Sequence, residues 1–187
     1  MIRLRNVGVL LALATAFAVV GASPSFAANT TVTANVNAGP AISLTAPASA
    51  SVTVTLNGSD QTPTYTAGLS AQDQTGSGAG WNITITSTQF TTGAPVHTLV
   101  TTASTVTSVA MVCAGPGTCT NPTNAITYPF GVPAGAGPPA AVKMYNAAAN
   151  TGMGNFTITP TVQVAIPANA FAGTYTSTVT FAIVSGP

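Results

Sequence analysis

Apolar residues alternate with threonine or asparagine along much of the chain, and this two-residue period constrains the fold more than any other feature. Trp81, Ile83 and Ile85 occupy every second position of one stretch, and Phe181 and Ile183 do the same near the C-terminus. Successive side chains of a β-strand point to opposite faces, so each stretch has one apolar and one polar face. The pattern predicts strands, each with one face in a core.

Outside the first 27 residues, no long segment shows the three- and four-residue apolar spacing of an amphipathic helix. Clusters of Gly, Pro and Asn separate the alternating stretches and are typical of turns. An all-β fold is therefore expected, a single antiparallel β-sandwich of the Ig-like or Greek-key type. The Gly/Pro-rich segment 113–139 is predicted to be a long loop within it. The predicted strands are 30–37, 41–46, 50–56, 64–70, 81–90, 97–110, 124–130, 140–146, 155–166 and 173–184.

The first 27 residues have the composition of a secretory leader. Arg3 and Arg5 precede an apolar run over 7–22, and a small-x-small cleavage pattern stands at 25–27. We expect the signal peptide to be removed, so that the mature chain, 28–187, is one exported β domain. The apolar run is short for a membrane span, and no later stretch approaches spanning length, so no span is expected in the mature chain.

Very few side chains of the mature chain are charged. Its only basic residue is Lys143 and its only acidic residues are Asp60 and Asp73, which gives a net charge of 1 − 2 = −1. Binding to nucleic acid requires several Lys or Arg side chains against phosphates, so this class of partner is excluded. Solubility must come from hydroxyl and amide groups, and a net charge so near zero favours self-association. This composition is typical of exported proteins in walls, fibres or surface layers.

Cys113 and Cys119 bracket a turn-forming segment that contains Gly and Pro. The pair lacks the Cys-x-x-Cys spacing of redox and metal sites, and no His lies near it in sequence. Export to an oxidising compartment favours a disulfide instead. In the chain-entropy model, closing so small a loop stabilises a fold by roughly 2 kcal/mol.

Catalytic groups are scarce in the mature chain. His97 has no nucleophile-elbow pattern beside it, Asp60 follows Asn-Gly-Ser as a turn residue does, and Asp73 precedes a Gly-rich loop whose N–H groups it could cap. One carboxylate is too few for a calcium cage. We expect no enzyme, no metal and no cofactor. A secreted hydrolase that uses both aspartates is the remaining catalytic alternative.

Two stretches resemble the WxL surface domain of Gram-positive bacteria: AQDQTGSGAGWNITITSTQF (71–90) and NTGMGNFTITPTVQVAIPANAFAGTYTSTVTFAIVSGP (150–187). In that family, an Asp precedes a Gly-rich turn and a Trp-x-Leu or Trp-x-Val strand, as Asp73 precedes Trp81 and Ile83 here. The family closes on a Gly-Thr-Tyr-Thr strand with a second Trp-x-Leu. In this chain Phe181-Ala182-Ile183 takes the place of that second motif, so the spacing is kept and the indole is replaced. Other matching positions are Gly76, Gly80, Gly152, Gly154, Phe156, Pro167, Gly173, Thr174, Tyr175, Thr178 and Pro187.

The resemblance implies a surface protein that associates noncovalently with peptidoglycan, in complexes with other exported proteins. Trp81, Phe181 and Asp73 are the candidate binding residues, and a packing role explains each of them equally well. For Trp81, the face that it shares with two isoleucines favours packing.

The leading hypothesis is a non-catalytic, secreted cell-surface protein that binds cell-wall glycan or other exported surface proteins. The alternative is a structural subunit of an extracellular fibre or surface layer. In that case the alternating stretch 31–37 would complete a neighbour's sheet by β-strand addition.

Overall fold

A computed structural model describes residues 30–187 of the chain. The predicted leader, 1–27, lies outside the described residues. Residues 36–187 form one compact unit. Residues 30–35 belong to a separate unit, and those six residues are exposed and form no strand.

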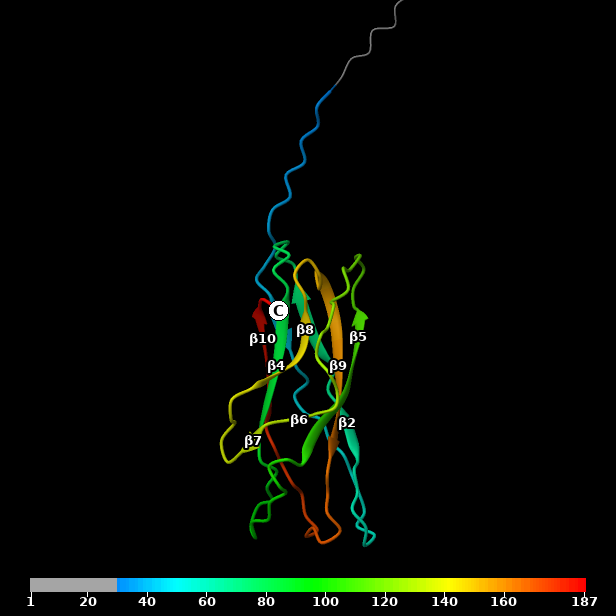
Figure 1. The fold of residues 1–187 in the computed structure, drawn as a ribbon, viewed down its shortest axis with the longest axis vertical. Coiled ribbons are helices and arrows are strands. Elements are labelled where there is room, and N and C mark those ends of the chain that lie inside the picture. Colours follow the sequence, from blue (N-terminus) through cyan, green and yellow to red (C-terminus); the bar gives the residue numbers. More distant parts are fainter. Residues whose placement is uncertain (1–29) are drawn as a thin grey trace, which may run out of the picture. The chain divides into compact units, whose positions relative to one another are not determined.

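The regular structure of residues 30–187 consists of β-strands in two sheets (Figure 1), which confirms the prediction of an all-β sandwich. Every strand pair is antiparallel except the short parallel pair of β4 with β7. The first sheet, in the order β1-β3-β9-β5-β6 with β2 also on β9, contains β1 (Ser43–Thr45), β2 (Thr64–Thr66), β3 (Leu69–Asp73), β5 (Ser104–Cys113), β6 (Phe130–Gly131) and β9 (Gly154–Val164). The second, with β10-β4-β7 in order and β8 also on β4, contains β4 (Trp81–Thr88), β7 (Ala134–Gly135), β8 (Val142–Ala147) and β10 (Val179–Ser185).

The core contains the apolar faces that the two-residue period predicts. Inward positions of β3, β4 and β9 are completely or almost completely buried, and each contributes about 1.5–3 kcal/mol through removal of its side chain from water. The largest of them are Leu69, Trp81, Ile83, Ile85, Phe156, Ile158 and Val162.

β9 continues through Pro160, although proline is rare in the interior of a sheet. Proline lacks the N–H that a strand neighbour needs. Here the neighbouring backbone is itself interrupted, because β2 ends at Thr66 and β3 begins at Leu69. On that side the Pro160 carbonyl accepts a hydrogen bond from the Ala67 N–H (3.4 Å). The Pro160 nitrogen, which has no hydrogen to donate, therefore faces the gap between β2 and β3, where no strand residue pairs with it.

Several predicted strands are wrong or displaced. Residues 30–37 and 50–56 form no strand although their side chains alternate, and only the last residue of 124–130 lies in a strand. The strand predicted at 97–110 is found at Ser104–Cys113. Alternation sets which face is apolar, but a strand also needs a partner backbone to pair with, and that partner is distant in sequence.

The predicted loop 113–139 contains β6 and β7, and part of it covers the polar face of β4. The Thr86 hydroxyl donates to the Pro139 carbonyl (2.8 Å), and the Asn82 amide donates to the Gly186 carbonyl (2.8 Å). Asn82 and Thr86 are therefore buried, so β4 is covered on both faces. Among residues 30–187, no helix has the length and apolar character needed to cross a membrane.

Candidate functional site

The two aromatic-x-aliphatic stretches that are 100 residues apart in sequence lie on neighbouring strands. β10 pairs with β4 through seven consecutive residues, with Ile183 opposite Ile83 and Phe181 opposite Ile85. Apolar side chains directly opposite each other on one face contact across the strands. The two stretches therefore form one continuous part of the second sheet.

Trp81 is enclosed by its own chain. Only 1% of its surface is exposed, and its indole N–H donates to the Gly152 carbonyl at 2.8 Å. The rings of Tyr145 and Phe156 pack against it with centroid separations of 6.0 and 6.3 Å. A ligand has no access to an indole buried in this way, so the structure supports a packing role for Trp81.

At two positions next to Trp81 there is no room for a side chain, and both are occupied by glycine. Gly80 and Gly152 both have a φ of +73°. A Cβ on Gly80 would collide with the backbone of Ala147 and Ala148, and one on Gly152 would lie 2.6 Å from the Trp81 indole nitrogen. Glycine is therefore required at both positions for two independent reasons, backbone conformation and space.

Asp73 is committed to the turn that leads into β4. It is 4% exposed, and its Oδ1 accepts hydrogen bonds from the Thr75 N–H (3.1 Å) and hydroxyl (2.7 Å). The Thr75 hydroxyl in turn accepts from the Ser77 N–H (3.2 Å), and the Ser77 hydroxyl from the Ala79 N–H (3.3 Å). This series of side-chain caps replaces the strand hydrogen bonds that the turn lacks.

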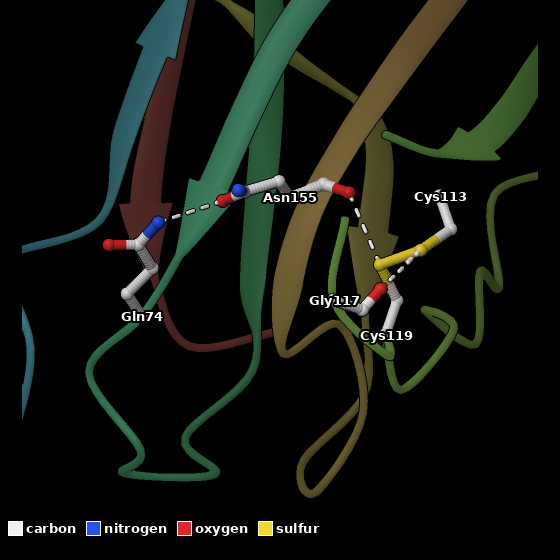
Figure 2. Close-up of a disulfide and its surroundings, with 5 residues drawn as sticks. All are labelled: Gln74, Cys113, Gly117, Cys119 and Asn155. Atoms are coloured by element: carbon white, nitrogen blue, oxygen red, sulfur yellow. Dashed lines mark hydrogen bonds between the residues drawn. A yellow bond between two sulfur atoms is a disulfide. The ribbon is translucent and has the colours of Figure 1, made fainter. Parts of the chain in front are cut away.

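The predicted disulfide between Cys113 and Cys119 is present, and it joins the last residue of β5 to the loop that follows, next to the start of β9 (Figure 2). The Asn155 carbonyl accepts from the Ala114 N–H at 2.8 Å and lies 3.3 Å from the Cys119 sulfur, which carries no hydrogen to donate. The Asn155 side chain accepts a 3.0 Å hydrogen bond from the Gln74 amide. Asn155 thus links the disulfide loop to the turn after Asp73.

Phe181 differs from the other two candidate residues because it lines a cavity. It is only half-buried and contributes to a groove of about 480 Å³. We call this cavity the aromatic groove, and define it by residues 46–52, Tyr65, Ala67, Phe90, 174–179 and Phe181.

The aromatic groove combines aromatic rings with hydroxyl groups and has no charged side chain. Four rings line it, those of Tyr65, Phe90, Tyr175 and Phe181, and serines and threonines from both walls accompany them. One wall is held to the end of β4, since the Ser177 hydroxyl donates to a β4 carbonyl at 2.6 Å. Such a surface suits a neutral ligand that has apolar faces and hydroxyl or amide groups.

The side chains of Asp60, His97 and Lys143 also form contacts within the chain. The Asp60 carboxylate accepts from the Ala168 N–H (2.7 Å), and the His97 ring stacks on Phe171 with centroids 3.9 Å apart. The Lys143 ammonium donates to the carbonyl of Pro187 (2.9 Å). Within residues 30–187, no three side chains of His, Cys, Asp or Glu gather closely enough to hold a metal ion.

Burial raises the pKa of Tyr65, Tyr128 and Tyr145 above the ordinary value of 10.0. At Tyr128, the nearby Tyr145 adds to the effect of burial, and the hydrogen bond from the Asn124 amide lowers the pKa. The neutral phenol is therefore favoured more strongly in the folded chain than in the unfolded chain.

From the raised pKa values of these three tyrosines we expect the free energy of unfolding to fall at alkaline pH. Below about pH 10 both states keep their phenolic protons, and the tyrosines add no pH dependence. Above it the unfolded chain loses protons first, so the free energy of unfolding should decrease as pH rises through the raised pKa values. Urea unfolding between pH 8 and about 11 tests this. An increase in stability above about pH 10 would contradict the burial of these groups.

Comparison with known families gives a match over nearly the whole chain. The family described as "WxL domain surface cell wall-binding" matches residues 23–187, nearly the whole chain. The chain belongs to the WxL family. Comparison of the WxL chain with curated proteins and with solved structures gave no match. The match confirms the resemblance that the two motif stretches indicate, and identifies a cell-wall-binding surface protein.

In this WxL domain the three candidate residues have different surroundings. Trp81 and Asp73 are buried in contacts with their own chain, whereas Phe181 faces the aromatic groove. Sequence reasoning missed the groove because its walls come from stretches that are far apart in the chain. The two motif stretches gave a partial signal of it, because the groove is lined by Phe90 of the first stretch and by Thr174, Tyr175, Thr178 and Phe181 of the second.

Proposed function

We propose that this WxL domain is an exported, non-catalytic protein that binds the neutral glycan strand of peptidoglycan noncovalently in the aromatic groove. The observation that carries the proposal is the lining of that groove by four aromatic rings and many hydroxyls, without one charged side chain. Sugar rings have apolar faces that stack on aromatic rings, and hydroxyl and amide edges that form hydrogen bonds.

The electrostatics of the domain support a neutral ligand. The three charged side chains of residues 28–187 all have contacts within the chain, and none of them lines the groove. Attraction between charges weakens as salt is added, whereas stacking and apolar contacts do not. Binding in this groove should therefore persist at salt concentrations that release proteins held by ion pairs.

Co-sedimentation with purified peptidoglycan tests the proposal. The pelleted fraction should stay constant up to about 1 M salt, and soluble N-acetylglucosamine oligomers should release the protein. Recovery in the supernatant at every salt concentration would contradict wall binding. New reducing ends in the incubated glycan would contradict the absence of catalysis.

A variant locates the binding site. Ala50 is an exposed residue of the groove wall and lies outside every strand, so Ala50→Arg should leave the fold intact. The long charged side chain should obstruct the groove and weaken binding at least tenfold, about 1.4 kcal/mol. Ala136→Arg, at an exposed position outside the groove, is the matched control and should bind like the wild type. Equal binding by the two variants would exclude the groove.

A further inference from the structure

β10 has one edge without a strand partner in the described chain. It pairs with β4 along all seven of its residues, in a continuous register without a bulge, and no strand of residues 30–187 pairs with its other side. The unpaired edge of a strand presents N–H and C=O groups that another strand can bind.

The other edge strands of the two sheets have features that discourage pairing. β8 carries the charged Lys143, β5 has a register irregularity between Val106 and Ser108 in its pairing with β9, and β1, β2, β6 and β7 are only two or three residues long. Charges, bulges and short lengths all protect edges from another strand. The sequence of β10, VTFAIVS, has no charge, no Pro and no Gly. It is therefore the least protected edge of the described chain.

Residues 31–37 have the properties of a strand that has no partner. They alternate apolar and polar side chains, carry no charge and form no strand, and Val32 and Val36 are 86% and 95% exposed. This segment has the same length as β10, seven residues. Burying two exposed valines against another apolar surface would be favourable.

We propose that residues 31–37 of one copy of the chain add as a strand to the free edge of β10 in a second copy. A register with Ala34 opposite Phe181 places the two valines beside Val179 and Ile183, on the half-buried face of β10. This holds whether the added strand runs parallel or antiparallel, because Ala34 lies midway between the valines. Each copy has one donor segment and one acceptor edge, so the contact is head-to-tail and extends to further copies.

The proposed self-association does not require wall binding, but it uses residues that also line the aromatic groove. Val179 and Phe181 belong both to the acceptor edge and to the aromatic groove. A strand on β10 would therefore compete with a glycan for these two side chains.

Cysteine cross-linking between copies tests the pairing. The proposed register places exposed Ala182 opposite Thr33 in an antiparallel pair and opposite Asn35 in a parallel pair. Full-length chains that carry Thr33→Cys or Asn35→Cys are each mixed with Ala182→Cys under mild oxidation, without cell wall. We expect a disulfide-linked dimer with one of the two donors only.

Two controls complete the experiment. Ala110→Cys, at an exposed position of β5, should cross-link with neither donor. Adding Val32→Asp and Val36→Asp to the reactive donor should abolish its cross-link, because these exposed positions do not support the fold. Absence of a cross-link to Ala182→Cys, or equal cross-linking to Ala110→Cys, would overturn the proposal. Because no glycan is present, either result leaves the proposed wall binding unaffected.

Discussion

Replacing Trp81 by alanine should destabilise the fold by about 3–5 kcal/mol, the range for truncating a large buried aromatic residue. The change removes the ring that packs between Tyr145 and Phe156, and it leaves the Gly152 carbonyl without its donor. The loss is a large fraction of the 5–15 kcal/mol by which domains are stable, so the variant should be partly unfolded in mild denaturant. Urea unfolding followed by circular dichroism measures the change.

Trp81→Phe is the matched variant. It keeps an aromatic ring in the core but cannot donate to the Gly152 carbonyl, and leaving that group unpaired costs about 1–3 kcal/mol. The ranking should therefore be wild type, then phenylalanine, then alanine. An alanine variant as stable as the wild type would show that Trp81 does not hold the core together.

Gly80→Ala should cost about 2–5 kcal/mol, the second-largest effect that we expect. Two terms contribute: an alanine at φ +73° is strained, and its Cβ would lie 2.9 Å from the carbonyl carbon of Ala148. Since backbone rather than a flexible side chain occupies this space, the turn before Trp81 would have to move. Thermal and urea unfolding of the variant measure the cost.

Gly76→Ala separates the two terms. Gly76 lies in the same turn with a φ of +68°, but nothing lies within 4 Å of a Cβ built on it. It should show only the strain of positive φ, about 1–2 kcal/mol. Equal costs at Gly76 and Gly80 would mean that the close approach to Ala148 does not matter.

The regular strands of the core could be predicted from the sequence because their own side chains determine their faces. The alternation of Trp81, Ile83 and Ile85 predicted a buried face on β4, and the structure confirms it. The spacing and surroundings of Cys113 and Cys119 predicted a disulfide, and the disulfide is present. In each case the information lies within a short stretch of chain.

Features that depend on distant parts of the chain could not be predicted. Residues 50–56 alternate as a strand does, yet Val52 and Leu56 remain 36% and 38% exposed because no partner strand lies beside them. The polar face of β4 was expected to be opposite the core, but a covering segment and the C-terminal residues bury Asn82 and Thr86. The aromatic groove needs four separate stretches to come together.

The contrast between Trp81 and Phe181 bears on how the two motifs of this WxL domain act. Trp81 lies at the centre of the core, and the Gly-rich turn and Asp73 position the strand that carries it. Phe181 lies on the neighbouring strand and reaches the groove. The first motif therefore builds the scaffold, and in our proposal the second contributes to the binding surface.

The affinities of Trp81→Phe and Ala50→Arg for purified peptidoglycan at high salt, measured side by side, test this division most directly. The phenylalanine variant should bind within about twofold of the wild type although its fold is less stable, and the arginine variant should bind at least tenfold more weakly although its fold is unchanged. The reverse order, with binding lost in Trp81→Phe and kept in Ala50→Arg, would contradict both the structural role of the tryptophan and the binding role of the groove.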